Sequence, residues 1–206
     1  MCSKEVTIIA VTKNHPFSAI EKALENNIFN IGENRVQETE KKIKGKILPP
    51  ETKLHLIGHL QKNKVRKAVK IYDYIQTVDS LSLAKKIDKI SLEYKKVQKI
   101  LLQINIGNKS DRKGFLTSEI KEAAEEINIY KNICIKGIMI IPPLEKDQKK
   151  YLNYFDESQA IKKNIEKKIK TCKYLSMGMS NDYTEAIKKG ATHIRIGTAL
   201  FGNRQK

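Results

Sequence analysis

The feature that most constrains the fold of this 206-residue chain is the alternation of eight short apolar runs with seven segments of helical periodicity. The apolar runs are 6–13, 29–34, 53–60, 74–79, 97–106, 133–141, 174–180 and 193–202. The segments predicted to be helices are 16–26, 36–44, 62–70, 80–94, 117–129, 145–170 and 181–189. Near-continuous apolar runs that alternate with helices indicate parallel strands buried on both faces. The predicted fold class is therefore α/β, a single (β/α)8 TIM-type barrel, which needs eight such units.

An open, doubly wound parallel sheet is the alternative architecture for the same pattern. No linker interrupts the alternation, so residues 1–206 are expected to form one domain. The chain begins almost on the first strand, and nothing helical is predicted after the eighth. A closed barrel would then leave the outer faces of the first and last strands short of cover. Either a partner subunit or polar outward residues could resolve this.

Cysteine content and hydropathy limit the class of protein. The three cysteines, Cys2, Cys134 and Cys172, are far apart, and no CxxC pair or Cys/His cluster is present. A metal site is therefore not expected, and few scattered cysteines suit a reducing cytosol. The N-terminal apolar run is too short for a signal peptide, and no run approaches the roughly 18 apolar residues of a membrane span. The expectation is a cytoplasmic protein that does not associate with membranes.

The net charge of +17 allows two interpretations. Basic chains attract nucleic acids, and a basic nucleic-acid-binding protein is one alternative function. The lysines, however, are spread over nearly every predicted helix, as in Lys85-Lys86 and Lys167-Lys168, and no aromatic platform for bases accompanies them. A solvated, lysine-biased surface that attracts small anions is the favoured interpretation, with no nucleic-acid partner.

Lys13 ends the first predicted strand, where a barrel would place it at the mouth. Active sites of such barrels lie at the carboxyl ends of the strands. Strand alternation puts Ile9, Val11 and Lys13 on one face, so the Lys13 side chain is expected to point into the mouth. Partial desolvation favours the neutral amine that forms a Schiff base. A lysine that merely reaches solvent from a strand end explains the position equally well.

Polar residues also mark the ends of the seventh and eighth runs. Ser176 lies on one face of the seventh run, and the eighth contains Arg195, Gly197 and Thr198. Glycine lets backbone N–H groups approach an oxyanion, and threonine adds a hydroxyl donor. Barrels often bind phosphate at the loops after their seventh and eighth strands. The pattern therefore indicates a phosphate site. Polar residues on inward strand faces could instead satisfy one another inside the barrel, since unpaired buried polar groups are costly.

Taken in order, these segments resemble the pyridoxal phosphate homeostasis proteins, which bind the vitamin B6 cofactor pyridoxal 5'-phosphate. The matching stretches are AVTK (10–13), FNIGENRVQE (29–38), HLIGHLQKNK (55–64), QTVDS (76–80), LLQINIG (101–107), RKG (112–114), GIMIIPP (137–143) and LSMGMSNDYTEAIKKGATHIRIGTALFG (175–202). They span nearly the whole chain, and the last is highly specific. The resemblance implies a barrel of the alanine racemase N-terminal domain type and a role in buffering or delivering the cofactor, without strong catalytic activity.

The resemblance also implies a set of cofactor-binding residues. These are Lys13, Asn34, His55, Met139, Ser176, Arg195, Gly197 and Thr198. Lys13 would form the Schiff base, and the serine, glycine and threonine would hold the phosphate. Asn34 and His55 would line the pocket, with Met139 near the ring. Arg195 would face the pyridine nitrogen, and because guanidinium keeps its protons, it would weaken the ring as an electron sink.

The chain departs from the family pattern in two places. The family usually has a helix before the first strand, which this chain lacks, and it often reads Ser-Lys-Thr-Lys where this chain has Thr12-Lys13-Asn14-His15. A second lysine near the cofactor is therefore missing. A pyridoxal phosphate-dependent amino-acid racemase-like enzyme is the main alternative function. The family implies a monomer and cofactor-requiring apo-enzymes as partners, although the uncovered barrel face leaves room for a dimer.

Overall fold

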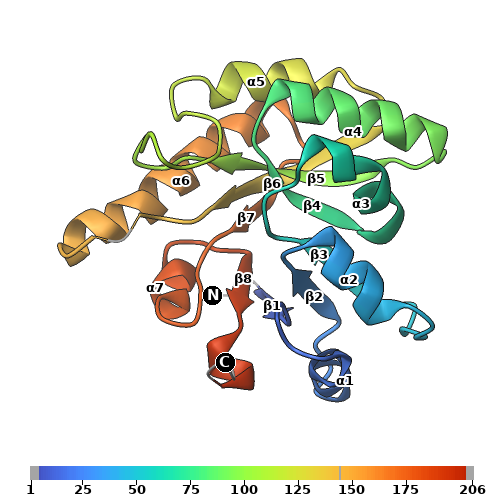
Figure 1. Cartoon of the computed structure of the whole chain (residues 1–206). Helices are drawn as coiled ribbons and strands as arrows, with labels where there is room; N and C mark the ends of the chain where they lie inside the picture. Colours follow the sequence, from blue (N-terminus) through green and yellow to red (C-terminus); the bar gives the residue numbers. More distant parts are fainter. Residues whose placement is uncertain (1–4, 144, 203–206) are drawn as a thin grey trace.

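The eight apolar runs form eight parallel strands that close into one barrel in the computed structural model, which describes residues 5–143 and 145–202 (Figure 1). The strands are β1 (Thr7–Val11), β2 (Asn30–Glu33), β3 (Lys53–Leu56), β4 (Tyr74–Val78), β5 (Gln98–Ile104), β6 (Ile133–Ile140), β7 (Tyr174–Ser176) and β8 (His193–Ile196). Each strand pairs with the next, and β8 pairs with β1 from Thr7↔His193 to Ala10↔Ile196. This closure excludes the open sheet. Residues 1–4 and 203–206 of the predicted domain lie outside the described residues.

The segments between the strands form helices that cover the outside of the barrel (Figure 1). They are α1 (Phe17–Glu25), α2 (Val36–Ile43), the 3₁₀ turn η1 (Lys62–Lys64), α3 (Val65–Ile71), α4 (Leu81–Glu93), α5 (Ile120–Asn128), α6 (Gln148–Lys168), α7 (Tyr183–Lys188) and α8 (Thr198–Phe201). Ser80 begins α4 as predicted, because its hydroxyl accepts a hydrogen bond from the Leu83 amide. Asp147 caps α6 in the same way.

Strand alternation divides the buried residues into two groups: those between the strands and the helices, and those inside the barrel. Outward strand residues such as Ala10, Ile31 and Leu56 pack with the buried faces of the helices in one apolar cluster. The inward residues are more polar than an ordinary barrel filling. At Gly137 the β6 and β7 backbones approach so closely that an added Cβ would lie 2.0 Å from the Tyr174 carbonyl oxygen. This glycine is therefore required by the barrel packing.

The end of β8 corrects one prediction. The strand stops at Ile196 instead of continuing to 202, and the short helix α8 follows, where nothing helical was predicted. Gly197 (φ −120°, ψ −77°) turns the chain out of the extended conformation. On the outer faces of the closing strands, Ile194 and Ile196 are buried, whereas Ile8 of β1 is 40% exposed. The predicted shortage of cover is thus confined here to β1.

Within residues 5–143 and 145–202, no helix combines the length and apolar character needed to cross a membrane. The same residues contain no group of three or more His, Cys, Asp or Glu side chains arranged to hold a metal ion.

Candidate functional site

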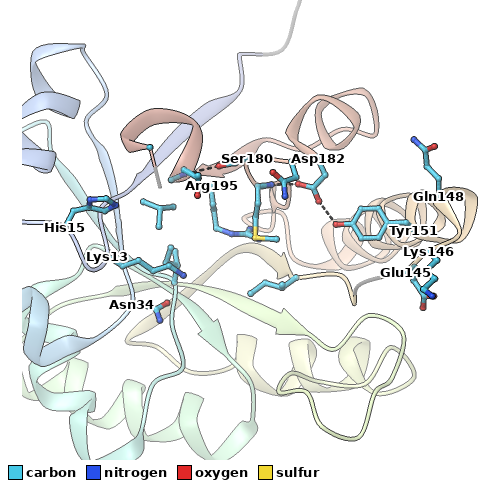
Figure 2. Close-up of a pocket in the computed structure, with 18 residues that line it drawn as sticks. Lys13, His15, Asn34, Glu145, Lys146, Gln148, Tyr151, Ser180, Asp182 and Arg195 are labelled. Atoms are coloured by element: carbon cyan, nitrogen blue, oxygen red, sulfur yellow. Dashed lines mark hydrogen bonds between the residues drawn. The ribbon is translucent and has the colours of Figure 1, made fainter. Parts of the chain in front are cut away.

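A cavity of about 550 Å³ opens at the carboxyl ends of the strands (Figure 2). Its walls come from the loops after β1, β2, β3, β6, β7 and β8 and from the first turn of α6. Parallel strands all present their carboxyl ends on one side of a barrel, so residues distant in sequence meet here. In Figure 2, Lys13, Asn34 and Arg195 surround one end of the cavity, and Tyr151, Gln148, Lys146 and Glu145 lie at the other.

Lys13 lies two residues beyond β1 and lines the cavity with Val11, as the strand alternation predicts. Thr12 between them points the other way and is fully buried outside the barrel. His15, which occupies the place of the family's second lysine, also lines the cavity. Its ring lies 5.5 Å from that of Phe201 in α8. The β1–α1 loop therefore supplies one amine and one imidazole to the same wall.

Arg195 enters the cavity from β8 and is held by two hydrogen bonds. Its guanidinium donates to the Ser176 hydroxyl and to the Ile140 carbonyl, each at 2.8 Å. Burial lowers the pKa of Arg195 to about 10, while Asp182 and Tyr151 act in the opposite direction. The group keeps its charge at neutral pH. It therefore presents a fixed cation to the cavity, with N–H donors beyond the two that are engaged.

Gly197 and Thr198, at the end of β8, line the cavity as predicted, together with Ser180. The Ser180 hydroxyl accepts hydrogen bonds from the backbone amides of Gly197 and Ala199, at 3.4 and 3.3 Å. Two amides and a hydroxyl thus converge on one place, an arrangement suited to an anion. Ser180 was not among the site residues predicted from the sequence. The one signal for it was its position as the last residue of the seventh run, at the end of the stretch SMGMS (176–180).

Three of the residues predicted for the site do not line the cavity. Ser176 is fully buried inside the barrel, where it donates to the Gln76 side chain and accepts from Arg195. His55 is 1% exposed and stacks on Tyr74, with ring centroids 4.5 Å apart. Met139 is fully buried against Tyr74. Each has the predicted inward orientation and is the last or next-to-last residue of its strand, and its contact with a ligand stays a prediction.

These inward polar groups satisfy one another. The Gln76 amide donates to Nδ1 of His55, so the Nε2–H of that imidazole donates to Asn30. The other end of the Gln76 amide accepts from Ser176, which accepts from Arg195. A continuous chain of hydrogen bonds therefore crosses the barrel interior from β2 to the floor of the cavity.

The far end of the cavity holds a pair that the sequence analysis missed. The Tyr151 hydroxyl of α6 donates to Asp182, at 2.5 Å, and the other carboxylate oxygen of Asp182 accepts from the Met179 amide. Burial, and then the Asp182 carboxylate, raise the pKa of Tyr151 above its ordinary value. Tyr151 lies in the segment 145–170 that was predicted to be a helix, and no local pattern connects it with Asp182.

Comparisons of the sequence and of the structure with known proteins point to the same family. The family model for the alanine racemase N-terminal domain matches residues 1–205. The chain is 38% identical over 200 residues to the pyridoxal phosphate homeostasis protein of Synechocystis, covering 97% of this chain and 92% of that protein. PipY of Synechococcus elongatus is similar in structure without pyridoxal phosphate (TM-score 0.90, 35% identity, 96% of this chain and 93% of PipY) and with it bound (0.85, 34%, 96% and 92%).

Proposed function

Because this chain belongs to the alanine racemase N-terminal domain family and, within it, to the pyridoxal phosphate homeostasis proteins, we propose that it binds pyridoxal 5'-phosphate and buffers or delivers it. The observation that carries the proposal is one cavity that combines a lysine, a buried arginine and a set of anion donors. A relative of the same fold, PipY, has been solved with pyridoxal phosphate bound. We assign both the binding and the buffering or delivery of the cofactor to the single barrel domain.

The cavity residues fit the chemical groups of this cofactor. Lys13 supplies the primary amine for a Schiff base with the aldehyde. The amides of Gly197 and Ala199 converge where an anion is favoured, and the adjoining Thr198 and Ser180 hydroxyls can donate to phosphate oxygens. Arg195 supplies N–H donors for the ring nitrogen. About 550 Å³ is ample for a ligand of this size, since small-molecule sites occupy roughly 300–1,000 Å³.

The same residues favour a carrier over an amino-acid racemase. Racemisation needs a proton donor or acceptor on each face of the substrate carbon. Lys13 could serve one face, and Tyr151 is the one tyrosine among the described residues that line the cavity. Its hydroxyl is committed to Asp182, and its raised pKa keeps it protonated, so it is poorly suited to accept a proton. Arg195 holds its protons, which disfavours strong electron withdrawal into the ring.

The proposal extends to the recipients of the cofactor and to the compartment. Cytosolic apo-enzymes that require the cofactor are the expected recipients. Few, scattered cysteines suit that compartment, and both described cysteines, Cys134 and Cys172, are free thiols.

Borohydride reduction followed by peptide mass spectrometry tests the proposal. The chain is mixed with pyridoxal phosphate and reduced, and we expect a pyridoxyl adduct on Lys13. Lys13→Ala should lose the adduct and the visible absorbance of the Schiff base. Lys22→Ala, which removes an exposed lysine from the neighbouring helix α1, should retain both. An adduct that persists in Lys13→Ala at wild-type level would refute the assignment, and steady racemisation of L-alanine would refute the carrier role.

A further inference from the structure

Helix α2 holds the two peptide groups on either side of Lys13. On one side, the Lys42 ammonium donates to the Thr12 carbonyl at 2.9 Å. On the other, the Asn14 amide donates to the Glu38 carboxylate at 2.7 Å. The first group belongs to the peptide that enters Lys13, and the second to the peptide that leaves it. The backbone on both sides of this residue is therefore tied to charged side chains of one helix.

A buried carboxylate completes this cluster. Glu33, the last residue of β2, is fully buried outside the barrel. One of its oxygens accepts from the Thr12 hydroxyl at 2.6 Å and from Lys42 at 2.5 Å. The Lys42 side chain is only 6% exposed. Residues Glu33, Glu38 and Lys42, called here the α2 cluster, thus hold Thr12 by its side chain and by its carbonyl.

The backbone that the α2 cluster holds is unusual. Asn14 has a φ of 62°, in the left-handed region that asparagine tolerates better than most residues. The Thr12 carbonyl also accepts from the His15 amide at 3.1 Å, which closes a tight turn around Lys13. The direction in which the Lys13 side chain leaves the backbone depends on this turn. The Glu38 contact is made at the left-handed residue itself.

Stability alone is a weak reason for such a cluster. A buried ion pair is often no more stabilising than apolar residues of similar volume, because desolvation offsets the attraction. The second oxygen of Glu33 is buried without a hydrogen-bond partner among the described residues. The hydrogen bonds of the cluster to the β1–α1 loop instead fall on Thr12 and Asn14, the residues on either side of Lys13. None of its members lines the cavity.

We propose that Glu33, Glu38 and Lys42 are positioning residues, which hold the backbone of residues 12–14 so that the Lys13 amine is aimed at the ligand in the cavity. This inference rests on the proposed function, because it takes Lys13 as the residue that captures the cofactor aldehyde. The cluster touches no ligand and acts through Lys13.

Glu38 offers the cleanest test, because it is partly exposed and accepts a hydrogen bond from the Asn14 amide, while its other contact, an ion pair with Lys42 at 3.5 Å, stays within the cluster. Glu38→Ala removes the acceptor, whereas Glu38→Gln keeps an oxygen at the same place. Glu40→Ala is the matched control: it removes an acidic residue of the same helix whose partner is the exposed Lys67. Two quantities are measured: hydrogen exchange of the Asn14 amide in cofactor-free protein, and the affinity for pyridoxal phosphate.

The expected result is that Glu38→Ala exchanges the Asn14 amide faster and binds pyridoxal phosphate about tenfold more weakly, the scale of one hydrogen bond to a charged group. Glu38→Gln should behave nearly as the wild type in both measurements, and Glu40→Ala should match the wild type.

Normal affinity in Glu38→Ala would overturn the positioning role, even with faster exchange, because the contact would then be structural only. A Glu38→Gln variant as weak as Glu38→Ala would overturn it too, because the backbone acceptor would not be what matters. If the wild type and Glu40→Ala bind no pyridoxal phosphate, the proposed function itself fails and takes the positioning role with it.

Discussion

Two buried histidines make the barrel sensitive to acid. His55 and His193 face the interior, 1% and 7% exposed, with ring centroids 6.4 Å apart. Burial lowers the pKa of His55 to about 3, with smaller contributions from His193 and Lys99. Burial also lowers the pKa of His193 to about 4, and the charge of Arg195 adds to this. Nδ1 of His55 accepts from Gln76, so protonation would also break a hydrogen bond.

The direction of the effect follows from linkage. In the unfolded chain each histidine takes up a proton near pH 6.5, whereas the folded chain resists protonation down to about pH 4 or below. Folding stability is therefore full above about pH 6.5 and falls as the pH decreases. At pH 5 the pH lies about 1.5 units below the pKa of each histidine in the unfolded chain. At 1.36 kcal/mol per unit, each histidine therefore lowers the free energy of unfolding by about 2 kcal/mol. The two together cost about 4 kcal/mol, a large part of the roughly 5–15 kcal/mol that stabilises a typical domain.

Urea unfolding of the cofactor-free protein at pH 7.5 and pH 5.0 measures this loss. We expect the wild type to lose about 4 kcal/mol of unfolding free energy, and His55→Gln or His193→Gln to lose about 2 kcal/mol. His59→Gln, at an exposed position on the loop after β3, is the control and should lose as much as the wild type. The reasoning is refuted if the double variant His55→Gln/His193→Gln loses as much stability as the wild type over this pH range.

Two further predictions concern the anion end of the cavity and the barrel wall. Ser180→Asp places a carboxylate against the Gly197 and Ala199 amides, so affinity for pyridoxal phosphate should fall by at least about tenfold through like-charge repulsion. Titration with pyridoxal, which has no phosphate, should show little change, and an equal loss for both compounds would contradict the assigned anion end. Gly137→Ala would force β6 and β7 apart and should cost about 3 kcal/mol or more. Gly45→Ala, in open space at a φ of 70°, should cost only about 1 kcal/mol in the same thermal unfolding assay.

The order of the strands was predictable because each is a short apolar run with a clear boundary. The sixth run illustrates this: it was predicted to span 133–141, Pro142-Pro143 follow it and cannot continue a strand ladder, and β6 ends at Ile140. The eighth run was extended wrongly to 202, because Ala199, Leu200 and Phe201 are as apolar as a strand. Four residues are too few for periodicity to distinguish a strand from one turn of helix.

The site was predictable only where it depends on strand ends. Lys13 and Arg195 line the cavity because alternation gives the side on which a residue lies. Alternation does not give the depth, which depends on the stagger of all eight strands. Ser176 therefore has the predicted inward orientation, but alternation did not reveal that it bonds Arg195 outside the cavity lining. Tyr151 and Asp182 meet through the direction of α6 over the loop after β7, a long-range relation that no local pattern contains.

Two roles were predicted for the polar residues on the inward strand faces: hydrogen bonding to one another, or lining a ligand site. Arg195 both bonds another inward residue and lines the cavity. Its bond to Ser176 belongs to the chain that continues through Gln76 to His55, while its remaining surface lines the cavity. Each member of that chain is satisfied by its neighbour, which limits the cost of burying it. The same bonds fix the guanidinium before any ligand arrives, so its orientation is already set. Polar residues at the centre of an otherwise apolar barrel are thus explained by the cation they hold at its mouth.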